Sequence, residues 1–411
     1  MRITLLNILI FGLLLSIISF SCDKKINPVV VFLKTPSNVG GEPNLHRSEQ
    51  GELLLSWIEY DDEKVSLLFS KLINDQWGEP SQIAEGDNWF VNWADFPSIS
   101  SYQNNDDHLV AHWLQKSDVG TFDYDVRMSQ SKNGGLSWDS SFVIHSDGIA
   151  AEHGFVSMLP MDIERMFITW LDGRNTKTGD PNEDETGHGH SGAMSLRAAQ
   201  IDINGHKYFD EQIDKKICDC CQTSAALTSC GPVVVYRDRS DEEIRDISIS
   251  RRETDGWMVP HAVHHDNWKI NGCPVNGPVV RALDKRVAVA WFTMSEDVPK
   301  VNVAFSDDCG DNFALPVRVD NGDPLGRLDM LMIDSNDVIV SWIELTDDQA
   351  EIYFAQINRY KGLVDKWPIV STENARRSGF PRLEKHKEEI ILTWTAVKDT
   401  TTFVQTARIE L

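Results

Sequence analysis

Seven short apolar segments recur along the chain, and each ends in an aromatic residue followed by a charged or polar turn. Subtracting the numbers of the aromatic residues gives spacings of 56, 57, 66, 55, 51 and 52 positions. Short apolar runs between turn residues are typical of buried strands. A strand repeat of about 50 residues is typical of a β-propeller with one blade per repeat. The segments are Leu53–Trp57, Leu109–Trp113, Met166–Trp170, Val233–Tyr236, Val287–Trp291, Val338–Trp342 and Ile390–Trp394.

Each repeat divides into four strand-like pieces, except the seventh, which ends after three. The segment Val29–Lys34 reads like the fourth strands of the other repeats, so we expect it to pair with Phe403–Ile409 and close the ring. Closure of this kind leaves no open sheet edge. The predicted fold is therefore all-β, a single propeller over residues 29–411. We predict seven four-stranded blades, or six if one repeat is not a blade.

The N-terminus has the pattern of an export signal. Arg2 precedes a mostly apolar run over residues 3–20, which ends in Ser19, Phe20, Ser21 and Cys22. A basic start, an apolar stretch and a small-residue cleavage region predict a secretory signal, and the ending resembles that of a bacterial lipoprotein, with Cys22 as the lipidated residue. The alternative is a transmembrane anchor. We expect a signal peptide at 1–21, a tether at 22–28, and export to a bacterial cell envelope with a lipid anchor in a membrane.

Charge limits the partners. The formal net charge of −24 gives a surface that repels nucleic acid and anionic lipid. We therefore expect no nucleic-acid partner and contact with a membrane through the lipid anchor alone. We expect the protein to be a monomer.

Four repeats share a further pattern between their third and fourth strands, a serine followed seven positions later by an aromatic residue. The pairs are Ser70 and Trp77, Ser131 and Trp138, Ser250 and Trp257, and Ser306 and Phe313. Asn133 with Gly135, and Asp308 with Gly310, make two copies similar to the Asp-box, Ser-x-Asp-x-Gly-x-x-Trp. In such a loop the carboxylate or amide accepts backbone N–H groups and glycine supplies the tight turn. Residues 29–411 thus resemble the sialidase-like superfamily of propellers with BNR (Asp-box) repeats.

This resemblance implies a ligand site on the face opposite the Asp-boxes, in a central depression built from the turns between second and third strands and from the links between blades. Sialidases of the family hold a substrate carboxylate with three arginines, and use a tyrosine nucleophile, a glutamate and an aspartate. Their Phe/Tyr-Arg-Ile-Pro sequence is absent here, so those residues cannot be transferred one by one. The implied function is binding, with hydrolysis as an option, of an acidic or glycan ligand. An enzyme of this kind would be an exo-sialidase-like glycoside hydrolase.

Arginines and carboxylates gather in the segments that should form this face. Forked guanidinium groups suit a carboxylate or sulfate, and a carboxyl beside them could donate a proton. The alternative is an ion-pair network that braces the blades. The candidate proton donors are Asp172 and Asp238, and the candidate ligand-binding residues are Arg174, Arg237, Arg239, Arg245, Arg327, Asp95 and His153.

Cysteines occur in the same segments. Cys218, Cys220 and Cys221 open one blade and Cys273 opens the next, so a disulfide from Cys273 to Cys220 or Cys221 is expected in an exported protein. The alternative is a thiolate metal site that includes His153; no other cofactor is expected. That alternative makes the protein a non-enzymatic scaffold or a metal- or redox-linked envelope protein. Cys230 and Cys309, on the opposite face, form a second pair or are unpaired. His188 and His190 lie in an acidic insertion and make an incomplete metal site.

Overall fold

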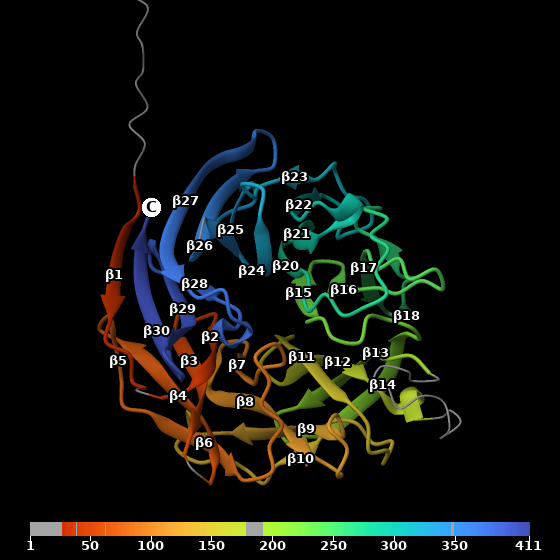
Figure 1. Cartoon of the computed structure of the whole chain (residues 1–411). Helices are drawn as coiled ribbons and strands as arrows, with labels where there is room; N and C mark the ends of the chain where they lie inside the picture. Colours follow the sequence, from red (N-terminus) through yellow and green to blue (C-terminus); the bar gives the residue numbers. More distant parts are fainter. Residues whose placement is uncertain (1–26, 38, 62, 178–191, 347–348) are drawn as a thin grey trace, which may run out of the picture.

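The computed structural model describes residues 27–37, 39–61, 63–177, 192–346 and 349–411. The predicted signal peptide, Cys22, most of the tether, and the insertion with His188 and His190 lie outside these ranges. The described chain forms seven antiparallel sheets arranged around a ring (Figure 1). The seven-bladed propeller predicted from the repeat is confirmed. Within the described residues, no helix has the length and apolar character needed to cross a bilayer.

The first strand of each blade lies nearest the axis and the last at the rim. Blades 1 to 4 contain β2 (Gly41–Arg47), β3 (Leu53–Tyr60), β4 (Val65–Ile73), β5 (Gln76–Trp77) and β6 (Ser81–Gly86); β7 (Ser98–Tyr102), β8 (Asn105–Lys116), β9 (Tyr124–Ser131) and β10 (Phe142–Val143); β11 (His153–Pro160), β12 (Arg165–Asp172), β13 (Ser195–Asp202) and β14 (Lys207–Asp214); and β15 (Ser224–Thr228), β16 (Gly231–Arg237), β17 (Ile247–Glu253), β18 (Gly256–Trp257) and β19 (His261–Ala262). Short 3₁₀ turns are η1 (Arg174–Lys177), η2 (Ser295–Asp297) and η3 (Arg376–Ser378).

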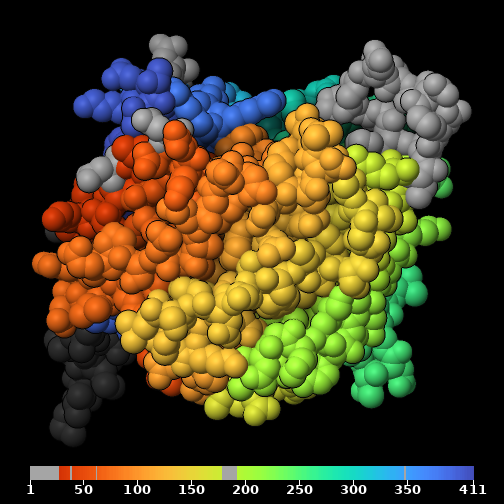
Figure 2. All heavy atoms as spheres, turned by 90° about the horizontal axis from the view of Figure 1, so that it is seen from below, coloured from red at the N-terminus to blue at the C-terminus, as the bar shows by residue number. Residues whose placement is uncertain are grey.

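The remaining blades follow the same order. They contain β20 (Val279–Leu283), β21 (Arg286–Thr293), β22 (Lys300–Ser306) and β23 (Val317–Arg318); β24 (Pro324–Met332), β25 (Asp337–Thr346), β26 (Gln349–Asn358) and β27 (Gly362–Thr372); and β28 (Arg382–His386), β29 (Glu389–Lys398) and β30 (Thr401–Glu410) with β1 (Val29–Leu33). Figure 2 shows the flank formed by the first half of the chain, coloured orange to green, as a closely packed wall of atoms.

The ring closes as predicted, through the N-terminal strand. β1 pairs antiparallel with β30, with Val29 opposite Glu410 and Leu33 opposite Thr406. Figure 1 shows the red β1 beside the dark blue β30. Blade 7 is therefore built from both ends of the described chain, and its outer sheet edge is supplied by β1.

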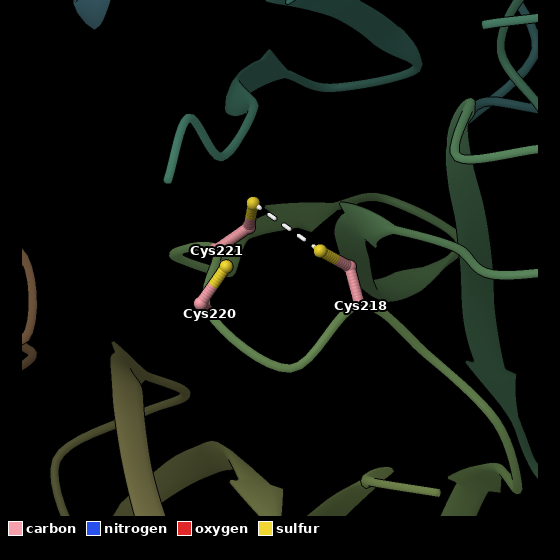
Figure 3. Close-up of side chains that lie close together, drawn as sticks. All are labelled: Cys218, Cys220 and Cys221. Atoms are coloured by element: carbon pink, nitrogen blue, oxygen red, sulfur yellow. Dashed lines mark hydrogen bonds between the residues drawn. The ribbon is translucent and has the colours of Figure 1, made fainter. Parts of the chain in front are cut away.

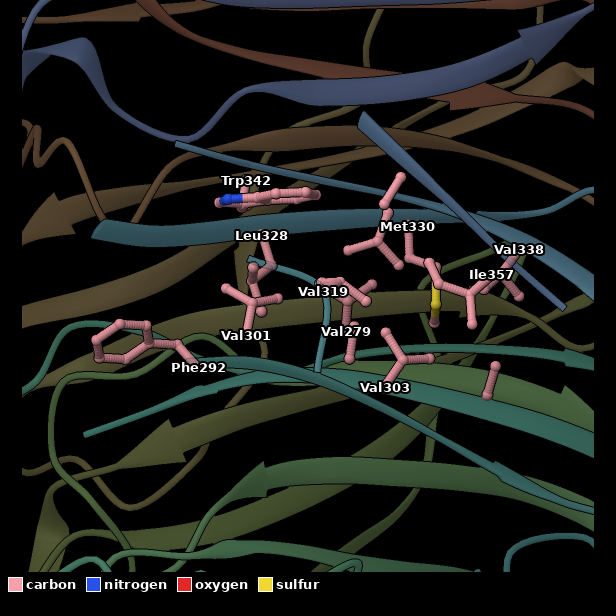
Figure 4. Packing of buried hydrophobic residues seen from close by; sticks show 14 of the residues in the cluster. Val279, Phe292, Val301, Val303, Val319, Leu328, Met330, Val338, Trp342 and Ile357 are labelled. Carbon is pink, nitrogen blue, oxygen red and sulfur yellow. The ribbon is translucent and has the colours of Figure 1, made fainter. Parts of the chain in front are cut away.

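Packing between neighbouring blades forms the core. The second strands are almost wholly buried; residues 338–343 of β25, for example, are all buried. Figure 4 shows one such interface, where Phe292 and Val303 of blade 5 face Met330 and Trp342 of blade 6. Each large apolar side chain buried in this way contributes about 1.5–3 kcal/mol. This explains why the apolar strands carry the repeat signal.

A carboxylate two positions after the strand-ending tryptophan recurs in three blades. The indole N–H donates to it at 3.1 Å in Trp57 and Glu59, 2.8 Å in Trp170 and Asp172, and 2.8 Å in Trp342 and Glu344. A buried indole N–H needs a partner. Asp172, predicted as a proton donor, therefore occupies a position that is structural in two other blades.

The two loops that resemble Asp-boxes form the same hydrogen bonds. The backbone N–H of Gly135 donates to Ser131 Oγ at 2.9 Å, and that of Gly310 donates to Ser306 Oγ at 3.0 Å. The side chains of Asn133 and Asp308 each accept a further backbone N–H, from Ser137 at 3.0 Å and from Asn312 at 2.9 Å. Both loops are thus self-contained turns at the same place in their blades; their assignment as BNR repeats stays a prediction.

Cys230 and Cys309 form a disulfide with an S–S distance of 2.01 Å. Cys230 lies between β15 and β16 and Cys309 between β22 and β23, so the bond joins blade 4 to blade 5 on the face of the Asp-box-like loops. The paired alternative predicted for these two cysteines is the one observed. A cross-link between residues 79 positions apart stabilises a fold by about 2–4 kcal/mol.

Hydrogen bonds from a backbone N–H of one blade to a side-chain oxygen in the link before the previous blade join successive blades near the axis on the opposite face. We call these hydrogen bonds clasps. Asp95 Oδ1 accepts the backbone N–H of Phe155 at 2.7 Å, and Asn276 Oδ1 accepts that of Arg327 at 2.7 Å. Phe155 and Arg327 have positive φ angles of 53° and 58°, a conformation that is costly for residues with a side chain. Asp95, predicted to bind ligand, thus serves as one of two matching clasps.

Candidate functional site

The segments predicted to form the ligand face do enclose a pocket, which we call the link pocket. Its volume is about 280 Å³, and it is lined by blade links and by turns between second and third strands of blades 2 to 5. The lining includes Phe122, Glu152, Lys177, Asp219, Cys220, Arg239, Arg245 and Cys273. Four of the predicted site residues therefore meet here: Arg239, Arg245, Cys220 and Cys273.

A pair of carboxyl groups shares one tyrosine at the edge of the pocket. The hydroxyl of Tyr124 lies 2.9 Å from Glu152 Oε1 and 3.3 Å from Asp95 Oδ2. Burial raises the pKa of Glu152 to about 8, although the Tyr124 hydrogen bond acts against it. Burial also raises the pKa of Asp95 to about 7. Glu152 can therefore hold a proton at neutral pH, which is what a general acid requires.

Two arginines are fixed on the far side of the pocket by shared carboxylates. Arg239 is 22% exposed and pairs with Glu243 at 2.9 Å and with Asp219 at 3.2 Å. Arg245 is nearly buried; it pairs with Glu243 at 2.8 Å and donates to Cys218 Sγ at 3.2 Å. Arg239 is the more exposed of the two, and its Nε and Nη2 donate to Glu243 while its Nη1 donates to Asp219. An anionic ligand would therefore have to share or replace one of these carboxylates.

Cys218, Cys220 and Cys221 bring their sulfur atoms together behind the pocket wall. The three Sγ atoms lie within 4.8 Å of one another, and Cys218 Sγ is 3.6 Å from Cys221 Sγ (Figure 3). All three and Cys273 are free thiols. The disulfide expected from Cys273 to Cys220 or Cys221 is thus not formed, and the sulfurs instead form a non-bonded cluster.

His153 lies elsewhere, so the metal set predicted to combine it with the cysteines is wrong. Its ring is buried, stacks on His145 at 3.7 Å, and contacts Asp147 at 3.0 Å and Asp172 at 3.8 Å. Every polar atom of the His153 ring has a partner in this network. Asp147, in the preceding link, and Asp172, at the end of the second strand of blade 3, lie beside this ring. A buried histidine needs such hydrogen-bond partners.

Asp172 and Arg174 belong to the same network. Arg174 donates two hydrogen bonds to Asp172, at 2.6 and 2.7 Å, and is 20% exposed. Burial acts to raise the pKa of Asp172, but the Arg174 fork and the charge of His153 outweigh it, and the pKa is lowered. Asp172 is therefore ionised and braced, and its contacts do not suit a proton donor.

Arg237 and Arg327 are also used by the fold. Arg237 is 2% exposed and donates to the carbonyl groups of Asn276 at 2.8 Å, Arg245 at 2.7 Å and Phe292 at 2.7 Å. Arg327 donates to the carbonyl of Ala375 at 2.8 Å, and its guanidinium lies 5.0 Å from the centre of the Trp93 ring. These contacts match the blade-bracing alternative, and neither side chain lines the link pocket.

Asp238 lies outside the link pocket, in a shallow hollow beside the rim strand of blade 4. Its carboxylate accepts the backbone N–H of Arg239 and the hydroxyl of Ser248. Burial, and then the charge of Asp214, raise its pKa. Asp238 can hold a proton more readily than an exposed aspartate, but none of the predicted ligand-binding residues lines the hollow in which it lies.

The axis itself holds a second cavity of about 420 Å³, lined by the first strands. Arg281 and Arg382 share Asp329 there, at 3.0 and 3.3 Å. We call the face formed by the blade links and by the turns between second and third strands the link face. On this face, Gln222 bridges the carbonyl of Ala94 and the N–H of Gly277, and Trp93 stacks on Phe380. Links from four blades thus meet over the axis, and the predicted central depression is crossed by these contacts.

Sequence reasoning did not single out Tyr124 and Lys177, and it placed Glu152 and Asp219 in the blade links of this face without assigning them a role. Glu152 directly precedes His153 in a blade link, so its place on this face was foreseeable. Its burial was not, because that depends on packing against Tyr124 from the preceding blade.

No model of a known protein family matches the chain, and no curated protein sequence matches it. Solved structures do match its fold at about 10% identity. An ulvan lyase bound to -[GlcA(1-4)Rha3S]- matches with a TM-score of 0.56, over 92% of this chain and 95% of the lyase. An α-L-arabinofuranosidase from Fusarium graminearum matches at 0.51, over 94% and 98%. The endosialidase of phage phi92 matches at 0.51, over 94% and 69%. At this identity the likeness shows a shared propeller fold.

Proposed function

We propose that this chain is an exported, envelope-anchored propeller that binds an acidic saccharide in the link pocket. The observation that carries the proposal is the charge of the pocket lining. Lys177, Arg239 and Arg245 face Glu152 and Asp219, in a chain of net charge −24. Because the pKa of Glu152 is raised to about 8, that carboxyl is largely neutral at pH 7, and the lining itself holds three cations against Asp219. Asp123 and Glu243, outside the lining, pair with these cations from behind.

The pocket has the means to orient such a ligand. A carboxylate or sulfate group of the ligand would take the place of Asp219 on Arg239 Nη1, and the ring of Phe122, 42% exposed, offers an apolar surface to a sugar face. A volume of about 280 Å³ lies at the lower end of the roughly 300–1,000 Å³ typical of ligand pockets. The ligand is therefore a short saccharide or the end of a longer one.

Saccharides are the first class to test because propellers of this fold include an α-L-arabinofuranosidase and a polysaccharide lyase. If the bound saccharide is hydrolysed, Glu152 is the proton donor, since it lines the pocket and its proton is available near neutral pH. An Arg239→Gln change would then weaken binding, whereas Glu152→Gln would stop turnover and leave binding in place.

The test is calorimetric titration of the full chain with uronic acids, sialic acid and matched neutral sugars. We expect acidic sugars to bind, and Arg239→Gln to lower their affinity by about tenfold or more, as for a lost charge-assisted hydrogen bond. Arg252→Gln is the control, because Arg252 is 26% exposed and pairs with Glu211 outside the pocket. Equal affinity in wild type and Arg239→Gln would refute the proposal, as would binding that ignores sugar charge.

A separate observation favours the alternative of a metal-linked envelope protein: the cluster of free thiols beside the same pocket.

A further inference from the structure

The free thiols are held where sulfur atoms can share a ligand. The sulfurs of Cys218, Cys220 and Cys221 lie within 4.8 Å of one another, and Figure 3 shows them on one short loop, with the sulfurs of Cys218 and Cys221 facing each other. Cys273, on the next blade link, lines the link pocket together with Cys220. Two successive blade links thus bring four thiols to one place.

The spacing of the sulfurs suits a metal ion better than a disulfide. A tetrahedral metal site with metal–sulfur bonds of about 2.3 Å separates its sulfurs by about 3.8 Å. Cys218 and Cys221 lie 3.6 Å apart, close to that value. A disulfide needs a sulfur separation of about 2.05 Å. The third sulfur, of Cys220, lies within 4.8 Å of the other two, so a shift of about 1 Å at most would bring it to the tetrahedral separation.

The loop that carries the thiols is fixed at both ends. The backbone N–H of Cys218 donates to the carbonyl of Arg237 at 3.0 Å, and that of Ile217 to Met194 at 3.0 Å. At the other end, Gln222 bridges two further blade links. A site whose ligands are positioned before binding loses little conformational entropy when the ligand arrives.

Arg245 supplies a positive charge to the cluster. Its Nη1 donates to Cys218 Sγ at 3.2 Å, and Glu243 holds its Nη2 at 2.8 Å. Metal ligation needs thiolates, and a neighbouring cation offsets part of their charge.

We propose that Cys218, Cys220 and Cys221 bind one thiophilic d¹⁰ cation, Zn²⁺ or Cu⁺, and that Cys273 completes the site from the side of the link pocket. Soft thiolate ligands select these cations. Binding replaces each S–H bond with a metal–sulfur bond and releases the proton to solvent, and no electron is transferred. The cation would join the link that opens blade 4 to the link that opens blade 5.

The first experiment uses the wild-type full chain, purified in detergent without oxygen and stripped of metal by a chelator. Zn²⁺ and, in a separate arm, Cu⁺ are titrated against a competing chromogenic chelator. We expect one cation per chain in the arm of the preferred metal, with release of protons. X-ray absorption of the loaded protein should show sulfur neighbours at about 2.3 Å. Oxygen and nitrogen neighbours alone would overturn the proposal.

Variants then assign the ligands. Cys220→Ser should abolish stoichiometric binding, and Cys273→Ser should lower the sulfur count by one. Arg245→Lys should weaken binding by about 10–100-fold, as for a residue that positions a metal ligand. Two controls should bind as wild type: the double change Cys230→Ser with Cys309→Ser, which removes only the disulfide pair, and His145→Gln, which changes the histidine cluster.

Three further results would overturn the proposal: binding of neither cation by the wild-type chain, undiminished binding by a folded Cys220→Ser variant, or disulfides among the four thiols in the anaerobic protein by mass spectrometry. If Cys220→Ser does not fold, the number of sulfur neighbours that X-ray absorption finds in the metal-loaded wild-type protein tests the proposal instead. Sugar titrations run in parallel keep this outcome separate from the proposed saccharide function, because Arg239→Gln should leave the metal stoichiometry unchanged.

Discussion

Side chains on the link face divide into two groups, according to whether the fold uses their polar atoms. Arg237 donates to three backbone carbonyl groups and is buried. Arg239, two positions along, pairs with carboxylates and lines the link pocket. The sequence shows both as arginines of one turn, so it predicted the same role for both. Their difference comes from which side of the strand end each side chain occupies, and from neighbouring blades that the local sequence does not reveal.

Gly154 should be intolerant of any side chain, because an added Cβ would lie 2.0 Å from Asp95 Oδ2. Gly154→Ala would force Asp95 away from the Phe155 N–H and break the clasp. We expect the free energy of unfolding to fall by about 1–3 kcal/mol, measured by chemical denaturation. Gly272→Ala is the matched control in another blade link, since its added Cβ would come no closer than 3.8 Å to another atom. Equal losses in the two variants would argue against the clasp.

His112 should make the fold sensitive to acid. It is fully buried on β8, and burial lowers its pKa to about 3, against about 6.5 in an unfolded chain. Between about pH 6.5 and pH 3, His112 is protonated in the unfolded state and neutral in the folded state. The free energy of unfolding therefore falls as the pH drops through this range.

The change His112→Asn removes this titration. The variant will be less stable at pH 7, but the slope of its unfolding free energy below pH 6 should be shallower by up to about 1.4 kcal/mol per pH unit. Denaturation curves from pH 7 to pH 4 measure the slope. Parallel curves for the two proteins would contradict the prediction.

Strands were more predictable than the contacts between them. The strands ending at Trp57, Trp170 and Trp342 could be predicted because a strand buried on both faces has a continuous apolar run in its sequence. The carboxylates of Glu59, Asp172 and Glu344 each lie two positions after a tryptophan. This spacing is visible in the sequence and could have predicted the indole hydrogen bonds, but no role was predicted from it. Which cysteines pair could not be read from spacing, since the bond between Cys230 and Cys309 depends on the packing of two blades.

Strand β1 should be essential to blade 7. Deleting residues 23–35 would remove the five-residue pairing with β30 and the contacts of Val30 and Leu33 with the core. At about 1.5 kcal/mol for each such side chain, the loss is about 3 kcal/mol, seen as a lower melting temperature and as aggregation through the bare edge. Deleting only residues 23–27 is the control and should have little effect. A melting temperature unchanged by the longer deletion would exclude closure by β1.

For the molecule as a whole, the propeller and its closure followed from the repeat, whereas the place of the site followed only in part. Arg239, Arg245, Cys220 and Cys273, all predicted for the link face, line one pocket there. The predicted central depression is crossed by contacts of Trp93, Gln222 and Phe380. Such contacts join blades far apart in sequence, and no local pattern encodes them.

The proposed attachment to a membrane depends on Cys22. Cys22→Ser should prevent lipidation, so the protein should no longer partition into the detergent phase on phase separation. Ser21→Ala is the control, since it keeps the cysteine and a small residue before it. Detergent partition by Cys22→Ser equal to wild type would favour the transmembrane alternative.

The pairing of Val29 with Glu410 also has a consequence for how the protein is made. The strand that emerges first from the ribosome has to wait for residues 401–410 before it finds its partner. A copy truncated before that point would keep two bare strand edges, and bare edges invite aggregation and proteolysis. Ring closure therefore depends on both ends of the described chain, and a copy that lacks either strand exposes an unpaired sheet edge.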